Sequence, residues 1–257
     1  MTLAIEVDLR PQLGPVRDQG RRATCLAFAT SAVHRHLHRH ASELSVEWLF
    51  YHAVTRAGDD PAHGSTIVDT QAVLRELGQS EEGFWPYQPH QPVKTAWRPP
   101  AGSAELLRCA AADRDHGAAA IAEALAAAHP VVLGLVVTEA FFGPWRRVAG
   151  EAVLRDDGLP AEGQFGHAVV AVGCGTLAGV PHLLIRNSWG SRWGRDGHAW
   201  MANHDVGRRL IGAFTVREGV ETGVSSDAVS SHSRARLASR GAAAEARRRA
   251  SRTDAAH

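Results

Sequence analysis

Apolar residues in the first half of the chain recur at the spacing of amphipathic helices. Residues 25–39 and 45–57 carry apolar positions three and four apart, and Ala29 and Val33 share one face of the first segment. A third segment, STIVDTQAVLRELG, follows a Ser/Thr cap and stops at Gly78. The later segment GAAAIAEALAAAHP is a further predicted helix, which ends at its proline because that residue cannot continue a helix.

The second half has the apolar runs of β-strands, separated by glycine-rich turns. The predicted strands cover residues 131–137, 167–175, 182–189, 198–203 and 211–216. The segment GCGTLAG, residues 173–179, is interpreted as a strand-to-strand turn. A helical half followed by a β-rich half predicts an α+β chain with a cleft between two lobes.

Two changes of composition suggest the domain organisation. Residues 86–103 are rich in proline and form a predicted surface crossing between the halves. We assign residues 1–219 to one domain, with a helical lobe at about 20–100 and a β-rich lobe at about 104–219. Residues 220–257 are rich in Ser, Ala and Arg and lack the side chains of a core, so we predict a disordered, solvated tail.

Bulk composition excludes several classes of function. The 257 residues are 44% hydrophobic and 21% charged with a net charge of +1, which is typical of a soluble globular protein. This balance offers no electrostatic basis for binding nucleic acid or a membrane. No apolar run has the length of a membrane span, and the N-terminus lacks the pattern of a secretory signal. Three cysteines are too few for a disulfide framework, so we expect a cytoplasmic protein.

The candidate chemistry begins at PVRDQGRRATCLAFATSAV, residues 15–33, which places a lone cysteine directly before a helix. The N–H groups and dipole at a helix N-terminus favour a thiolate at Cys25. A thiolate nucleophile needs a base, and an acyl intermediate needs donors for its oxyanion. Gln19 is a neutral donor that can fold back beside the Cys25 backbone N–H, and Gly20 allows the sharp turn.

A base for this nucleophile is found at the start of an apolar strand. His167 opens that strand, and Asn187 ends a later one, followed closely by Trp189. An asparagine oxygen can accept the imidazole N–H, and an indole can shield that hydrogen bond from water. Taken singly, Cys25 and His167 are more often core residues and Asn187 a turn residue. Their combination favours a catalytic site.

The histidine-rich segment HRHLHRH, residues 34–40, suggests a metal site at first sight. His34 and His38, and likewise His36 and His40, would lie one helical turn apart. Because no cysteine or carboxylate cluster completes a site, we predict an ordinary helix surface and no bound metal. No phosphate-binding loop is present, and we predict no cofactor.

Three sequence blocks resemble the signature blocks of the papain-like cysteine peptidase family. They are PVRDQGRRATCLAFAT, GHAVVAVG and LLIRNSWGSRWGRDGHAWM, in that order. The intervening segments ELSVEWLFYHA, HGSTIVDTQAVLRELG and EEGFWPY also resemble the family, and the resemblance extends from about Val7 to Val216. It implies a papain-like two-lobed α+β fold: a helical N-terminal lobe, an antiparallel β-barrel-like C-terminal lobe, and an active-site cleft between them.

The resemblance also implies residue roles. Cys25 matches the family nucleophile, His167 its general base and acid, and Asn187 the residue that orients the histidine. Gln19 matches the side-chain donor of the oxyanion hole.

Weaker matches concern substrate binding. Gly64 and Ser65 fall where the family's glycine-rich loop runs beside an extended substrate. Trp189 and Trp193 match the aromatic pair of the last block, and we expect Gly64, Ser65 and Trp189 to bind substrate.

The chain departs from the family pattern at two positions. The family's usual cysteine shortly before the nucleophile, which forms a disulfide, is Arg22 here, and the usual aromatic after the nucleophile is Leu26. The segment VDLRPQLGPVRDQG resembles the start of a mature enzyme. We therefore expect a bacterial-type variant without a prosegment or disulfides.

The function expected from these residues is that of a cysteine endopeptidase acting on peptide or protein substrates through a thioester. Two alternatives stay open: an acyl transferase or transpeptidase that uses the same residues, and a catalytically silent peptide-binding homologue. We expect neither nucleic acid nor membrane as a partner, and a regulatory protein partner is left open.

Overall fold

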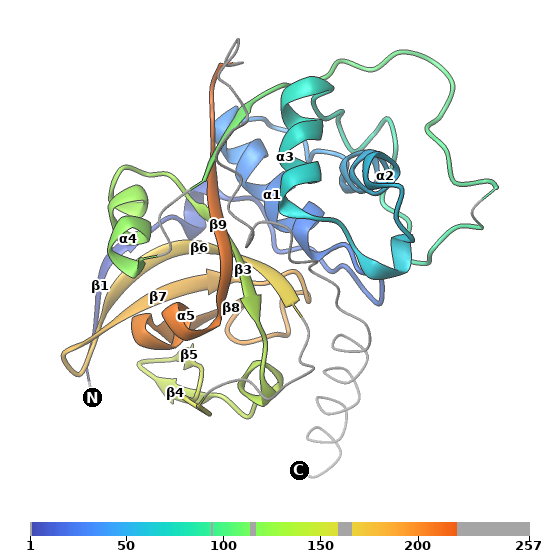
Figure 1. The fold of residues 1–257 in the computed structure, drawn as a ribbon. Coiled ribbons are helices and arrows are strands. Elements are labelled where there is room, and N and C mark those ends of the chain that lie inside the picture. Colours follow the sequence, from blue (N-terminus) through green and yellow to red (C-terminus); the bar gives the residue numbers. More distant parts are fainter. Residues whose placement is uncertain (1, 94, 114–116, 159–165, 220–257) are drawn as a thin grey trace.

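The computed structural model describes residues 2–93, 95–113, 117–158 and 166–219. The predicted tail at 220–257 lies outside the described residues. Figure 1 shows three helices gathered on one side of a strongly bent sheet, with two further helices beside the sheet. The helices on the first side are α1 (Cys25–Leu37), α2 (Val46–Ala57) and α3 (Ile67–Glu76). The two others are α4 (Ala118–Ala126) and α5 (Asn203–Arg209).

The four predicted helices are confirmed, although α4 ends at Ala126 and not at its proline, Pro130. The ends of α2 and the start of α3 have local causes. The Ser45 side chain accepts a hydrogen bond from the Trp48 backbone N–H at 3.0 Å, which caps α2. Gly58 ends that helix in the left-handed conformation, with φ of 64°. Thr66 caps α3 through the Asp69 backbone N–H at 3.1 Å. The short helix α5 was not predicted.

Within the described residues the strands form one nine-stranded sheet. Neighbouring strands follow the order β2-β9-β3-β6-β7-β8-β5-β4, and β1 pairs with β6. Strand pairing is antiparallel except between β5 and β8. Five of these strands confirm the predicted ones: β3 (Val131–Val136), β6 (Gly166–Leu177), β7 (Val180–Arg186), β8 (His198–Ala202) and β9 (Leu210–Arg217). Four were not predicted: β1 (Leu3–Asp8), β2 (Ala110–Asp113), β4 (Arg146–Val148) and β5 (Glu151–Val153).

The predicted strand-to-strand turn at residues 173–179 does connect two strands, β6 and β7, but it is much shorter than predicted. Most of that segment continues β6, and the chain reverses only at Ala178 and Gly179, whose φ values are 51° and 82°. Gly173 and Gly175 serve a different purpose, because β1 pairs antiparallel with β6 at these positions. A Cβ on Gly173 would lie 2.4 Å from the Val7 carbonyl oxygen, so glycine permits this close pairing.

The histidine-rich segment is not the predicted helix surface. His34 is fully buried, and its Nδ1 lies 2.9 Å from Oε1 of Gln79. Helix α1 ends at Leu37, so His36 and His40 do not share a helix. In the part of the chain that the structure describes, no group of three or more His, Cys, Asp or Glu side chains is placed to hold a metal ion. None of the described helices has the length and apolar character needed to cross a membrane.

Two buried histidines outside the candidate site predict acid sensitivity. Burial lowers the pKa of His34 and of His198 to about 4. The unfolded chain therefore binds more protons than the folded one between about pH 4 and 6.5, so stability falls as the pH falls through that window. We expect each histidine to cost about 1–2 kcal/mol of unfolding free energy between pH 7 and pH 5.

Urea unfolding at pH 7, 6 and 5 measures this loss. The variant His34→Gln keeps a donor for Gln79 but cannot titrate, and it is expected to show a shallower decline than the wild type. An equal decline in both proteins would contradict the role assigned to His34.

Candidate active site

Cys25 is the first residue of α1, and its side chain is fully buried. The first turn of the helix, CLAF, carries no acidic side chain, so nothing there opposes the positive end of the helix dipole. The side chain of Thr24 does not cap the helix; its Oγ1 lies 3.0 Å from the Tyr87 hydroxyl instead. The positive end of the helix dipole would stabilise a negative charge on Cys25, whereas burial of the side chain opposes that charge.

His167 occupies the second position of β6 and is fully buried. Its Nε2 lies 2.7 Å from Oδ1 of Asn187, which also accepts the Ser188 backbone N–H at 2.8 Å. Because that oxygen only accepts, the imidazole must donate through Nε2–H. The neutral ring then carries its basic lone pair on Nδ1, which has no hydrogen-bond partner among the described residues.

Burial also sets the charge of this histidine. It lowers the pKa of His167 to about 4, although the hydrogen bond to Asn187 acts in the opposite direction. The isolated ring is therefore neutral at pH 7, and only a nearby negative charge would favour the imidazolium form.

An aromatic wall covers the histidine. The ring centroids of Trp189 and His167 are 4.7 Å apart, and Phe142 stacks on Trp189 at 5.5 Å with an interplanar angle of 16°. The Trp193 indole donates to the Phe141 carbonyl at 2.7 Å. Trp189 lies where the sequence predicted it. The sequence did not predict that Phe141 and Phe142 lie at this site. Their adjacent positions shortly before Trp145 were the only signal in the sequence that could have suggested it.

Gln19 is linked to the His167–Asn187 pair through Ser188. The Ser188 hydroxyl donates to Gln19 Oε1 at 2.6 Å, and the Gln19 backbone N–H donates to the Ser188 carbonyl at 2.8 Å. The Gln19 side-chain amide donates to the Arg22 carbonyl at 2.8 Å. Gly20, with φ of 63°, makes the predicted turn. Hydrogen bonds thus connect Gln19 to Ser188, Ser188 to Asn187, and Asn187 to His167. The amino-acid sequence alone did not reveal this chain of contacts.

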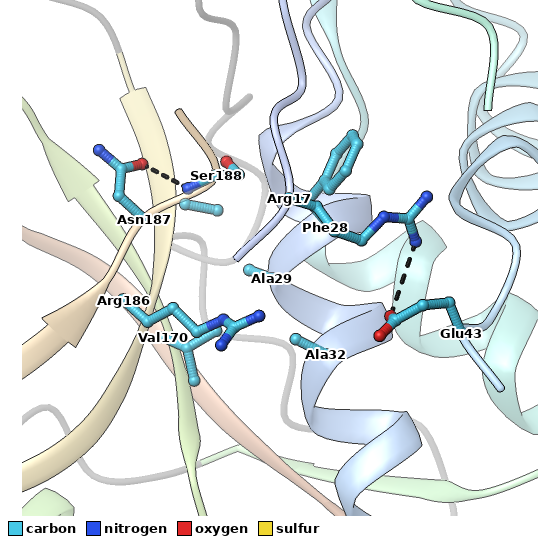
Figure 2. Close-up of a pocket in the computed structure, with 10 residues that line it drawn as sticks. Arg17, Phe28, Ala29, Ala32, Glu43, Val170, Arg186, Asn187 and Ser188 are labelled. Atoms are coloured by element: carbon cyan, nitrogen blue, oxygen red, sulfur yellow. Dashed lines mark hydrogen bonds and ion pairs between the residues drawn. The ribbon is translucent and has the colours of Figure 1, made fainter. Parts of the chain in front are cut away.

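Helix α1, which begins at Cys25, packs against β6, the strand that carries His167, and Asn187 directly follows the neighbouring strand β7. Figure 2 shows a small pocket between them, with Ala29 and Ala32 of α1 on one side and Asn187 and Ser188 at the other. Arg186 also lines this pocket and donates to the Gly14 and Pro15 carbonyls at 2.7 and 2.6 Å. These bonds hold the N-terminal segment against β7.

Gly64 and Ser65 lie in the turn that precedes α3. Gly64 has φ of 82°, and Ser65 is buried, with its hydroxyl 3.3 Å from that of Thr70. Their substrate-binding role stays a prediction.

The fold and these side chains define a two-lobed α+β protein with a cysteine, histidine and asparagine at its candidate site. A model of the papain family cysteine proteases matches residues 3–216. The chain therefore belongs to the papain family of cysteine proteases.

Individual relatives agree with this assignment. The chain is 27% identical over 208 residues to Peptidase 1 of Euroglyphus maynei, covering 79% of this chain and 62% of that protein. It is 28% identical over 194 residues to cathepsin K of Gallus gallus, covering 74% and 55%. The solved structure of digestive procathepsin L 3 from the larval midgut of Tenebrio molitor shares the fold. Its TM-score is 0.68 at 20% identity, covering 84% of this chain and 71% of that one. The chain spans less than two thirds of the two curated relatives.

Proposed function

We propose that this chain is a cysteine endopeptidase that hydrolyses peptide bonds through a thioester intermediate. The observation that supports it most strongly is the connected set of Gln19, Ser188, Asn187 and His167, opposite the helix that begins at Cys25. This set holds a base in one tautomer and a neutral donor beside it, as acyl transfer to a thiol requires.

In the first half of the reaction, Nδ1 of His167 takes the proton of the Cys25 thiol. The thiolate attacks the peptide carbonyl carbon, and the carbonyl electrons move to oxygen. The Cys25 backbone N–H and the Gln19 amide donate to that oxyanion. As the carbon–nitrogen bond breaks, His167 gives its proton to the leaving amine, and a thioester remains on Cys25.

In the second half, water attacks the thioester while His167 takes one of its protons. The same donors stabilise the second oxyanion. The carbon–sulfur bond then breaks, which releases the carboxylic acid and returns the thiolate beside the imidazolium.

The burial of His167 makes proton transfer within the pair essential. Because burial lowers the pKa of this histidine, the imidazolium forms only when the thiolate forms next to it.

The proposal extends to substrate and compartment. Trp189 excludes water from the His167–Asn187 hydrogen bond, and we assign Gly64 and Ser65 to the binding of an extended peptide. All three cysteines are thiols, which supports a reducing compartment such as the cytoplasm.

The test combines turnover with covalent labelling. We expect the protein to cleave denatured casein and to lose that activity on adding an epoxysuccinyl thiol-protease inhibitor. Intact mass should show one adduct, located on Cys25 by peptide mapping. Cys109 serves as an internal control, because burial raises the pKa of its thiol to about 12.

Two outcomes would overturn the proposal. A folded protein that neither cleaves casein nor forms an adduct would be a silent peptide-binding homologue. Products capped by an added amine, in preference to free acids, would identify an acyl transferase instead.

A further inference from the structure

Arg22 is a buried arginine between the candidate nucleophile loop and α2. Its side chain is 3% exposed, and it pairs with the fully buried Glu47 through two bonds, at 2.6 and 2.9 Å. The same guanidinium donates to the Gln88 carbonyl at 2.7 Å and to the Gln91 side chain at 3.1 Å. Every nitrogen of the planar group is therefore in use, in the fork geometry that arginine presents.

The partner carboxylate is equally well supplied with donors. Besides Arg22, Glu47 accepts the Trp97 indole N–H at 2.7 Å and the Gln88 backbone N–H at 3.0 Å. The guanidinium carbon also lies 5.4 Å from the ring centroid of Phe50 and 5.8 Å from that of Trp97. We call Arg22, Glu47, Gln88 and Trp97 the Arg22 cluster.

The Arg22 cluster connects directly to the predicted oxyanion donor. The Arg22 carbonyl accepts one N–H of the Gln19 amide at 2.8 Å. The amide has two N–H groups in one plane, so a bond that holds one of them sets the direction of the other.

Tyr87 supports the same loop from its other side. Its hydroxyl donates to the Gln19 carbonyl at 2.7 Å and lies 3.0 Å from Thr24 Oγ1, directly before Cys25. Its ring centroid lies 5.2 Å from the guanidinium carbon of Arg22. Arg22 is therefore linked to Gln19 in two ways: directly, through its own carbonyl, and indirectly, through the ring and hydroxyl of Tyr87.

We propose that Arg22 is a positioning residue for catalysis: through its buried pair with Glu47 it holds its carbonyl in place, and that carbonyl aims the Gln19 amide at the developing oxyanion. This inference rests on the proposed function. The Arg22 cluster holds this loop by hydrogen bonds and an ion pair, without a disulfide.

The substitution Arg22→Lys tests this positioning role, because it keeps the positive charge and changes the size of the side chain only slightly. An ammonium group is a point charge and cannot reproduce the two-bond pairing with Glu47 together with the bond to Gln88. We expect Arg22→Lys to lower kcat about tenfold on a fluorogenic peptide selected with the wild type. The KM should change less than twofold, because substrate binding precedes oxyanion formation.

Alkylation of Cys25 separates this role from general damage to the fold. Iodoacetamide reacts with the thiolate without forming an oxyanion, so its rate should stay within twofold of the wild type. Titration with the epoxysuccinyl inhibitor counts competent sites, and kcat is expressed per titrated site, so a partly unfolded sample does not obscure the result. Arg10→Lys is the matched control, because that guanidinium pairs with Asp8 and Glu151 beside β1. It should leave kcat unchanged.

The decisive comparison adds Arg22→Lys to Gln19→Ala. If Arg22 acts through Gln19, the double variant should be no slower per site than Gln19→Ala alone. The inference is overturned by a wild-type kcat in Arg22→Lys, by full additivity in the double variant, or by an equal fall in alkylation rate. Absence of wild-type turnover, or a Gln19→Ala variant as fast as wild type, would instead refute the proposed function or its oxyanion assignment.

Discussion

Replacing Cys25 by alanine is expected to abolish peptide hydrolysis, with a loss in kcat on the order of 10⁴–10⁶. Alanine removes the only atom that forms the acyl bond, while the His167–Asn187 pair and the Gln19 donor remain. A methyl group fits a site where the cysteine side chain is fully buried, so the fold should persist.

The measurement is the rate of peptide cleavage at equal concentrations of folded protein, with inhibitor labelling followed by mass spectrometry. Cys174→Ala is the matched control, since this second buried cysteine lies on β6 at its pairing with β1. It should retain wild-type turnover and one inhibitor adduct. Appreciable hydrolysis by Cys25→Ala, or loss of the adduct in Cys174→Ala, would show that the nucleophile is misassigned.

The second large effect is expected at Gln19. Substitution by alanine removes a neutral donor from the oxyanion and should lower kcat by about 10²–10³. KM should move far less, because the donor acts on charge that develops after binding. The hydroxyl of Ser188 would also lose its acceptor, which adds a smaller cost in stability.

Steady-state kinetics of Gln19→Ala, with sites counted by inhibitor titration, measures this loss. Gln71→Ala removes a glutamine whose amide bonds to Asp113 at the surface, and it should behave as wild type. A fall in KM and kcat together, or an unchanged kcat, would argue that the oxyanion is stabilised by other groups.

Much of the local structure could be predicted from the sequence alone. Thr66 caps its helix where a Ser/Thr signal was expected, because capping depends on residues only three positions apart. The apolar runs that became β3 and β6 are long enough to be recognised by pattern. The short strands β2, β4 and β5 carry three or four residues each, too few for any periodicity to stand out.

The glycines near the end of β6 have a local pattern that differs from their role in the fold. Gly173 and Gly175 resemble the start of a turn when only neighbouring residues are considered. Both glycines are required by β1, a strand from the opposite end of the chain. The backbone of β1 lies so close that a Cβ atom at either position would clash with it. A requirement imposed by a distant backbone leaves no local signature.

The amino-acid pattern was sufficient to find the longer helices and strands and the chemical candidates: a cysteine at a helix start, a histidine near the start of a strand, and an asparagine directly after the next strand. These features could be found because helix caps, strand patterns and reactive side chains are local properties. Folding was needed to reveal that Ser188 joins Gln19 to Asn187, that Phe142 stacks on Trp189, and that Arg22 pairs with Glu47. These contacts form between segments that are far apart in the chain. A buried polar group without a partner destabilises the fold, so the partners of these groups are set by the folded arrangement and not by their sequence neighbours.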